Sequence, residues 1–224
     1  MIFDKIIAVL PIVAQGACMT IVMTLAIVTI GLIGGFASGF VTCEKIRVRG
    51  LTQIIRVLEF IVRGTPIFIQ LLIIYFVLPN MLHINISPAI AGVITLSLTA
   101  IARFAEIVRH DVDQVPEGQW EACRVLGYSL PLILRSIVLP QVLRSSFASF
   151  IGESILLLKE TYIVSILGTI ELTKVAMNLG SRDLDPLTAY VLIAFVYLAI
   201  IGALTYLATF VQARFLRGGQ QSAD

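Results

Sequence analysis

Charged side chains are scarce in this chain. Asp, Glu, Lys and Arg make up 13% of the 224 residues, whereas hydrophobic residues make up 58%. A soluble domain of this size has too little interior to hide so much apolar surface, so the composition indicates a chain whose solvent is lipid. The formal net charge of +2 is too small to indicate a nucleic-acid partner.

Cysteines and catalytic motifs are also few. The three cysteines, Cys18, Cys43 and Cys123, lie far apart and form no C-x-x-C pair, so we predict reduced thiols and no disulfide or metal site. The sequence lacks G-x-x-x-x-G-K-[ST], which would bind the phosphates of ATP, and it lacks H-E-x-x-H and G-x-S-x-G. We therefore expect no catalytic residue, metal or cofactor in this chain. The N-terminal residues show no small-residue cleavage pattern, so a removable signal peptide is not predicted.

Long apolar runs dominate what is present. A hydrocarbon layer of about 30 Å needs about 20 helical residues. The runs predict five spans, near residues 16–40, 54–79, 87–108, 141–172 and 187–213. Gly31, Gly35 and Gly39 recur at intervals of four in the first span, a spacing that allows helices to pack closely in lipid. The expected fold is an all-α membrane protein with about five transmembrane helices, forming a single transmembrane domain over residues 1–224.

Prolines predict where these helices are interrupted. Pro66 predicts a kink or break inside the second span, Pro79 predicts its end, and Pro88 predicts the start of the third span. Pro131 is expected to open a short helix and Pro140 to open the fourth span. The fourth run is too long for one straight span, so we expect a bend or break within it.

Positive charge is divided unequally between the two sets of connecting segments. One set holds Lys45, Arg47, Arg49, Arg56, Arg103, Arg109, Arg124, Arg135, Arg144, Arg214 and Arg217. The other set holds Lys5, Lys174 and Arg182. Because cytoplasmic loops carry the excess of Lys and Arg, we expect the N-terminus outside and the C-terminus in the cytoplasm. An odd number of spans agrees with this orientation.

A polar segment, residues 103–144, separates the third and fourth spans and is too long to be a simple connector. Pro116 suits the first position of a helix, and Glu117 and Glu121 fall in the first turns, where the helix dipole favours negative charge. Gly127 lies where a left-handed residue would end the helix. The pattern predicts a short helix on the cytoplasmic membrane surface. On the residues alone, an amphipathic surface helix without a partner is an equally good interpretation.

Spacing along this helix indicates which residues meet a partner. Trp120, Cys123 and Val125 are expected to face it, and Ala122 is small enough to permit a close approach.

The same segment resembles a known signature. Glu121-Ala122-Cys123, Gly127 and Ile137-x-Leu139-Pro140 resemble the E-A-A-x3-G-x9-I-x-L-P motif of the membrane subunits of ABC importers, with Cys123 in place of one alanine. Further stretches are similar to the polar amino-acid branch of these permeases: Arg63-Gly64-Thr65-Pro66 with Gln70, Ala105-Glu106-Ile107-Val108-Arg109, Val115-Pro116-x-Gly118-Gln119-Trp120-Glu121-Ala122, Leu139-Pro140-Gln141 and Leu158-Lys159-Glu160-Thr161. His110-Asp111 departs from the branch, which usually has glycines there.

The resemblance implies a permease subunit of a type I ABC importer in a bacterial inner membrane. Two permease subunits, identical or related, would form the channel above two ATPase subunits that hold ATP-Mg, and an extracytoplasmic amino-acid-binding protein would deliver the substrate. A coupling loop at about residues 109–140 would transmit ATPase closure to the spans. The resemblance assigns that contact to Glu117, Trp120, Glu121, Ala122, Cys123 and Gly127.

Ionisable groups within the fourth span are candidates for substrate binding, because unpaired charges at membrane depth cost several kcal/mol. Glu153 follows Pro140 by about 20 Å of helix, which places it near the midplane. Glu160, seven residues later, would share its face on an unbroken helix. A structural alternative pairs Glu153 with Arg63 or Lys159. In the second span, Arg63 lies four residues after a glutamate and can pair with it.

We predict that Glu153 holds a positive group of the substrate. The other candidates for the substrate site are Arg63, Lys159, Glu160, Thr161 and Ser149. The resemblance implies that members with cationic substrates carry Glu at the position of Glu153, which favours arginine, lysine, histidine or ornithine. Every amino acid has an ammonium group, so glutamine, glutamate and cystine stay open. An ion-coupled secondary carrier would need an internal repeat, and the five unequal spans show none; a membrane scaffold without transport is the remaining alternative.

Overall fold

The computed structural model describes residues 2–46, 50–182 and 184–217, with side chains described for residues 5–213 of those ranges. Arg47 and Arg49, and the side chains of Arg214 and Arg217, entered the charge count and lie outside this described part. Every regular element within it is helical, as predicted. The elements are α1 (Ile2–Thr42), α2 (Leu51–Gly64), α3 (Ile67–Leu72), the π-helical η1 (Ile73–Val77), α4 (Leu78–Leu82), α5 (Pro88–Asp113), α6 (Glu117–Val125), α7 (Leu130–Ile133), the π-helical η2 (Leu134–Val138), α8 (Leu139–Ser145), α9 (Phe147–Glu160), the 3-10 helix η3 (Thr161–Leu167), α10 (Leu172–Arg182) and α11 (Pro186–Arg217).

Three helices are long and apolar enough to cross a membrane: α1, α5 and α11. The α2 helix and the helical stretch 67–82 pass the same test together, as a pair bent by 105°. The described residues therefore give three spans, or four if the bent pair is one span, where the sequence predicted five. The difference lies in the fourth predicted run, 141–172, which is divided among α8, α9 and η3. The break expected in that run is confirmed.

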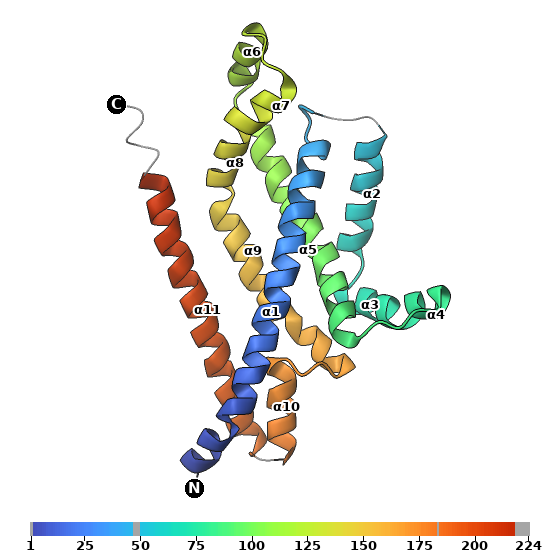
Figure 1. Cartoon of the computed structure of the whole chain (residues 1–224), viewed down its shortest axis with the longest axis vertical. Helices are drawn as coiled ribbons and strands as arrows, with labels where there is room; N and C mark the ends of the chain where they lie inside the picture. Colours follow the sequence, from blue (N-terminus) through green and yellow to red (C-terminus); the bar gives the residue numbers. More distant parts are fainter. Residues whose placement is uncertain (1, 47–49, 183, 218–224) are drawn as a thin grey trace.

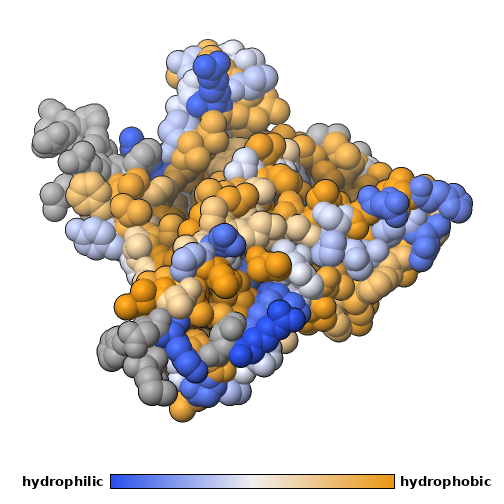
Figure 2. Space-filling view, turned by 60° about the horizontal axis from the view of Figure 1, so that its bottom comes forward, coloured by the Kyte–Doolittle hydropathy of each residue, from blue (hydrophilic) through white to orange (hydrophobic). Residues whose placement is uncertain are grey.

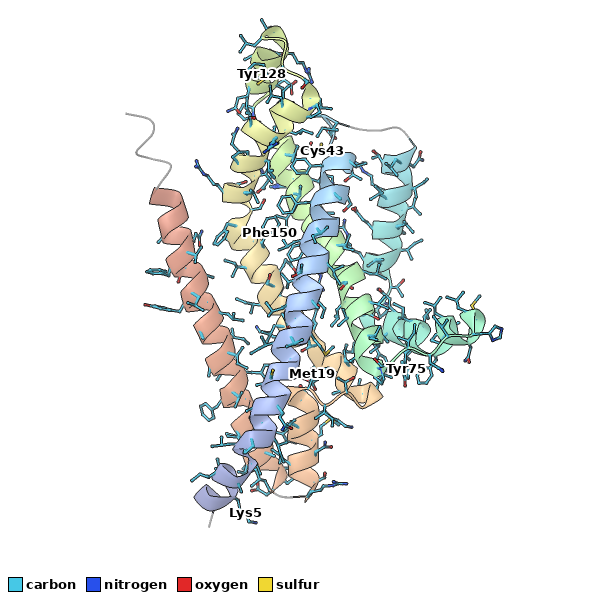
Figure 3. All side chains as sticks on the ribbon, viewed as in Figure 1. Lys5, Met19, Cys43, Tyr75, Tyr128 and Phe150 are labelled. Atoms are coloured by element: carbon cyan, nitrogen blue, oxygen red, sulfur yellow. The ribbon has the colours of Figure 1, made fainter. Side chains whose placement is uncertain are left out.

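Helices α1 and α5 run side by side through the centre of the molecule (Figure 1). The predicted close packing at the glycines of α1 is confirmed. A Cβ atom on Gly35 would lie 2.5 Å from Cβ of Phe104, and Gly31 and Gly39 meet α5 side chains at similar distances. Phe150 of α9 joins the same core (Figure 3), with its ring centroid 5.5 Å from that of Phe104.

The break between α2 and α3 follows from Pro66. Proline has no backbone N–H, so the carbonyl of Val62, four residues earlier, loses its helical donor. The side-chain amide of Gln70 replaces that donor, because its Nε2 lies 2.7 Å from the Val62 oxygen and 2.8 Å from the Thr65 oxygen. The break is thus a specified feature of the sequence, and the backbone leaves the helix at Thr65, which is extended.

Pro79 and Pro140 also lie inside helical stretches and do not bound them. Pro79 was predicted to end the second span, but the helix continues to Leu82; Pro140 was predicted to open the fourth span, but it lies inside the continuous helical stretch 130–145. Both follow a π-helical segment, η1 or η2. The wider turn gives the proline ring room beside the carbonyl four residues earlier, so the helix is not forced to stop. The helix starts predicted at Pro88 and Pro131 are confirmed.

The two ends of the molecule differ. Helix α6 lies at one end, with the last turns of α11 on the same side, and α10 lies at the other end beside the first turns of α1 (Figure 1). Apolar residues cover much of the face in Figure 2, and hydrophilic residues gather in separate patches. This surface agrees with a chain that is largely surrounded by lipid.

Candidate functional site

Helix α6 is the predicted surface helix. It spans Glu117–Val125, and Gly127 has a φ of 75°, so the left-handed residue expected after the helix is confirmed. Glu121 and Ala122 are exposed, and Val125 is 87% exposed. These three residues are part of the open, exposed face of the helix.

Two residues expected to face a partner point the other way. Trp120 and Cys123 are 1% and 4% exposed and belong to the main apolar core. They lie three residues apart, so they share the face of α6 that packs onto the chain itself. Lys45 lies 5.4 Å from the Trp120 ring and 3.5 Å from the carboxylate of Glu117, and it holds α6 to the end of α1. The partner-facing prediction was therefore wrong for Trp120 and Cys123.

Helix α6 is also linked to the helices that follow it. The side-chain amide of Gln141 on α8 donates to the side-chain oxygen of Gln119 at 2.9 Å. At the joint between α8 and α9, the hydroxyls of Ser145 and Ser146 both donate to the carboxylate of Asp111 on α5. Asp111, where the sequence departs from the amino-acid branch, therefore anchors this joint.

The central polar cluster joins α5 to α9. Arg103 forms a bidentate pair with Glu160, at 2.7 and 3.1 Å, and a longer contact of 3.4 Å with Glu153. The side chains of all three residues are about a quarter exposed, at 25–26%. The shared face predicted for Glu153 and Glu160 is confirmed, but their partner is Arg103, and not Arg63 or Lys159. Two carboxylates against one guanidinium leave the cluster with one excess negative charge.

The other predicted substrate residues divide between two surroundings. Ser149 is exposed one turn before Glu153, and Lys159 is exposed on another face of α9. Thr161 is fully buried and its hydroxyl donates to the Leu158 carbonyl at 2.7 Å, so it is closed to a substrate.

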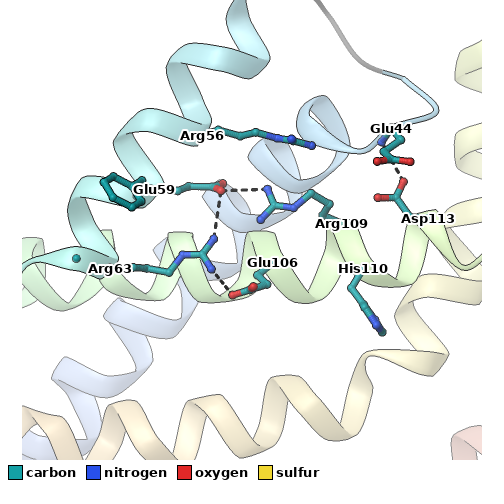
Figure 4. A pocket seen from close by; sticks show the side chains of 10 residues that line it. Glu44, Arg56, Glu59, Arg63, Glu106, Arg109, His110 and Asp113 are labelled. Carbon is teal, nitrogen blue, oxygen red and sulfur yellow. Dashed lines mark hydrogen bonds and ion pairs between the residues drawn. The ribbon is translucent and has the colours of Figure 1, made fainter.

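Arg63 belongs to a second polar cluster between α2 and α5 (Figure 4). Its guanidinium lies 3.4 Å from Glu59, the pair predicted from their spacing, and it also pairs with Glu106 on α5. Arg109 contacts the same Glu59 carboxylate at 3.0 Å.

A cavity of about 510 Å³ connects the two clusters. Residues 62–67 at the α2–α3 break, Thr99 and Arg103 line it. The cavity lies at a helix break and also contacts a guanidinium that faces two carboxylates. A guanidinium and two carboxylates together can bind both charged ends of an amino acid, and broken membrane helices are typical of substrate sites in transporters.

Arg103 is the site residue that sequence reasoning missed. It was counted with the loop arginines, yet it lies inside the predicted span 87–108. An ionisable residue within a span is itself a signal of a functional site. The sequence does not show which residues Arg103 pairs with. Arg103 and Glu153 are 50 residues apart, and only the packing of α5 on α9 brings them together.

Comparisons with known proteins agree with this architecture. The family model for the "Binding-protein-dependent transport system inner membrane component" matches residues 31–218. The chain therefore belongs to this family of transport permeases, and the resemblance to ABC importer subunits is confirmed.

Three relatives illustrate the range of the match. The L-cystine transport system permease protein TcyB of Bacillus subtilis is 32% identical, over 92% of this chain and 88% of its own. The arginine transport system permease protein ArtQ of the same species is 28% identical, over 95% of this chain and 96% of its own. A Rickettsia conorii protein named GlnP, for glutamine transport, is 29% identical over 91% of this chain and 93% of its own.

Solved structures match the fold. The structure described as "Crystal structure of an amino acid ABC transporter with histidines" has a TM-score of 0.85 and 29% identity, and it covers 95% of this chain and 98% of its own. An inward-facing structure of the MetNI methionine ABC transporter has a TM-score of 0.75 at 21% identity and shares the fold.

Proposed function

We propose that this chain is the permease subunit of an ATP-driven importer of amino acids in a bacterial inner membrane. One observation carries the proposal: Arg103, Glu153 and Glu160 form a polar cluster of both signs, and Arg103 also lines a cavity between α5 and the α2–α3 break. Arg103 would bind the substrate carboxylate and Glu153 its ammonium group. Glu153 can leave Arg103 for the substrate more readily than Glu160 can, because its contact with Arg103 is longer, at 3.4 Å.

The excess negative charge of the cluster favours a cationic amino acid. Arg103 balances one of the two carboxylates, so the second positive group of arginine, lysine, histidine or ornithine would neutralise the charge that remains in the cluster. A relative named for arginine transport supports this choice. Relatives named for glutamine and for cystine are as similar, so the second candidate is an amino acid without net charge, held through its carboxylate and ammonium groups.

Transport requires partners that this chain does not supply. We propose two ATPase subunits that carry ATP-Mg, a second permease subunit, and an extracytoplasmic binding protein. The α6 end would face the cytoplasm, with the C-terminus on that side and the N-terminus outside. Glu121, Ala122 and Val125 would then contact the ATPase.

The contacts within the chain give a route for coupling. Helix α6 is tied to α8 through Gln119 and Gln141, and the helix that contains α8 leads through the Ser146 joint into α9. A displacement of α6 would thus move α9, with Glu153 and Glu160, relative to Arg103 on α5. Separation of these charges would weaken the site when ATP binds.

The test is ATP hydrolysis by the complete transporter in lipid, with its binding protein and a panel of amino acids. Stimulation by arginine, lysine or histidine that is lost in Glu153→Gln supports the importer and the cationic substrate. Lys159→Gln is the matched control, because Lys159 is an exposed charge on the same helix, and it should keep the stimulation. Stimulation only by glutamine, glutamate or cystine would reject the cationic preference, and the absence of any co-purifying ATPase would reject the importer.

A second test addresses coupling. Glu121→Ala on the open face of α6 should weaken ATPase association or separate ATP hydrolysis from uptake, while the amount of folded permease stays the same. Normal stimulation of Glu121→Ala by the loaded binding protein would contradict the role of this face.

A further inference from the structure

A second cavity, of about 770 Å³, lies between α2 and α5 beside the end of α1 (Figure 4). Glu59, Arg63, Glu106 and Arg109 line it, and it extends toward the α6 end as far as Glu44 and Asp113. Arg63 and Gly64 line both this cavity and the 510 Å³ cavity that contains Arg103. The two cavities therefore adjoin, with Arg63 in the wall between them.

The carboxylate of Glu59 is incompletely satisfied. Its side chain is 6% exposed, and its Oε2 accepts from Arg109 at 3.0 Å and from Arg63 at 3.4 Å. Its Oε1 is buried and has no hydrogen-bond donor among the described residues. Buried carboxylate oxygens are rarely left without a donor, so this one indicates a site that a donor occupies at another stage.

Arg63 lies where a movement of its side chain would open or close the passage between the two cavities. Its guanidinium bridges Glu59 on its own helix and Glu106 on α5, so it fastens α2 across the boundary between the cavities. The adjacent Gly64 ends α2 at the 105° bend, where backbone rotation is easiest. A substrate carboxylate that reached Arg63 would compete with Glu59 and Glu106 for the same guanidinium.

We propose that the 770 Å³ cavity is an exit site for the transported amino acid and that Arg63 is the gate before it. The substrate carboxylate passes from Arg103 to Arg63 and Arg109, and Glu59, released from Arg63, receives the ammonium group. Each charged end thus exchanges one protein partner for another and is not left bare at membrane depth. This inference rests on the proposed function, and it adds a second binding site on the α6 side of the first.

The first experiment detects occupancy of the exit site directly. Phe60 lines the cavity and is 77% exposed, so Phe60→Cys, in a chain whose native cysteines are replaced by alanine, reports access to a thiol reagent. The sample is the complete transporter in lipid, and the probe is arginine, or glutamine if only glutamine stimulates ATP hydrolysis. At about ten times the half-protecting concentration, the amino acid should slow labelling about tenfold.

The control is Gln114→Cys, an exposed position at the same end of the molecule that lines a different cavity. Its labelling rate should not change when the amino acid is added. Equal labelling of Phe60→Cys with and without the amino acid overturns the exit site. If no amino acid stimulates ATP hydrolysis, the proposed function fails first, so the two failures are distinguishable.

A second variant tests the gate. Glu106→Gln removes the α5 anchor of Arg63 at an exposed position, so the chain is expected to fold. Stimulation of ATP hydrolysis by the loaded binding protein should persist, while uptake per ATP hydrolysed should fall about tenfold, the lower end of the effect of one hydrogen bond to a charged group. An equal loss of stimulation and uptake would mean that Arg63 serves the first site, and it would overturn the gate.

Discussion

The carboxylate of Glu171 and those of Glu153 and Glu160 have different surroundings, and the difference separates a structural role from a binding role. Glu171, between η3 and α10, is fully buried and accepts from the backbone N–H of Thr173 at 2.9 Å, from that of Lys174 at 2.7 Å and from the hydroxyl of Tyr197 at 3.3 Å. Burial raises the pKa of the Glu171 carboxyl above its usual value, although these hydrogen bonds oppose the rise. Its donors are fixed in the backbone or in a packed helix, so Glu171 joins α10 to α11 permanently.

The central polar cluster of Arg103, Glu153 and Glu160 is more exposed, and its contacts are ionic. Glu153 and Glu160 are about a quarter exposed. Their shared partner is Arg103, which has a long side chain with several rotatable bonds and lines a cavity. Neutral donors around a fully buried carboxylate stabilise one fold, whereas an ionic partner beside a cavity can be exchanged for a ligand. The donors around a carboxylate and its exposure together distinguish the structural Glu171 from the binding candidates Glu153 and Glu160.

The strongest test of this comparison is Arg103→Leu. We expect uptake to be lost, because the substrate carboxylate loses its partner and Glu153 and Glu160 repel each other. Stability should fall by about 1–3 kcal/mol, less than for a fully buried pair, since partial exposure lets water screen the two carboxylates. Thermal unfolding and uptake measure the two effects, and adding Glu160→Gln should restore stability without restoring uptake. A double variant that transports normally would contradict the role of Arg103.

Substitution of Glu171 should affect stability and leave the substrate site intact. Glu171→Ala removes the acceptor of two backbone N–H groups and one hydroxyl, so we expect a loss of about 1–3 kcal/mol, measured by thermal unfolding. The Glu171→Gln control keeps an acceptor oxygen and should lose less. At temperatures where the Glu171→Ala transporter is folded, its amino-acid preference should be that of the parent chain. A changed preference would mean that Glu171 belongs to the substrate site.

The smallest effect is expected at Thr161, which the sequence predicted as a substrate residue. Thr161→Val keeps the shape of the side chain and removes one hydroxyl that donates to the Leu158 carbonyl, so stability should fall by about 1 kcal/mol. Stimulation of ATP hydrolysis by each amino acid should be unchanged. A change in amino-acid selectivity would show that Thr161 is accessible to the substrate.

Sequence reasoning was most accurate where the determining residues are close together along the chain. Pro116 and Gly127 bound the surface helix as predicted, and Pro66 breaks the second span because its effect reaches only the previous turn. It failed where the answer depended on another helix. Trp120 was placed toward a partner because a helix pattern defines a face but not what covers it. Pro79 was taken as a helix end because the π-helical turn that accommodates it has no recognised sequence pattern.

The sequence by itself determined the solvent, the helical class, the surface helix and the transport family, because apolar run length and short motifs are local properties of the chain. Only the tertiary structure decided which charges meet. Arg103, Glu153 and Glu160 lie up to 57 residues apart, and the close approach of α5 to α1 and α9 sets their distances. The partner of a charge depends on how helices are rotated and packed in three dimensions, and the spacing of residues along a single helix does not contain that information.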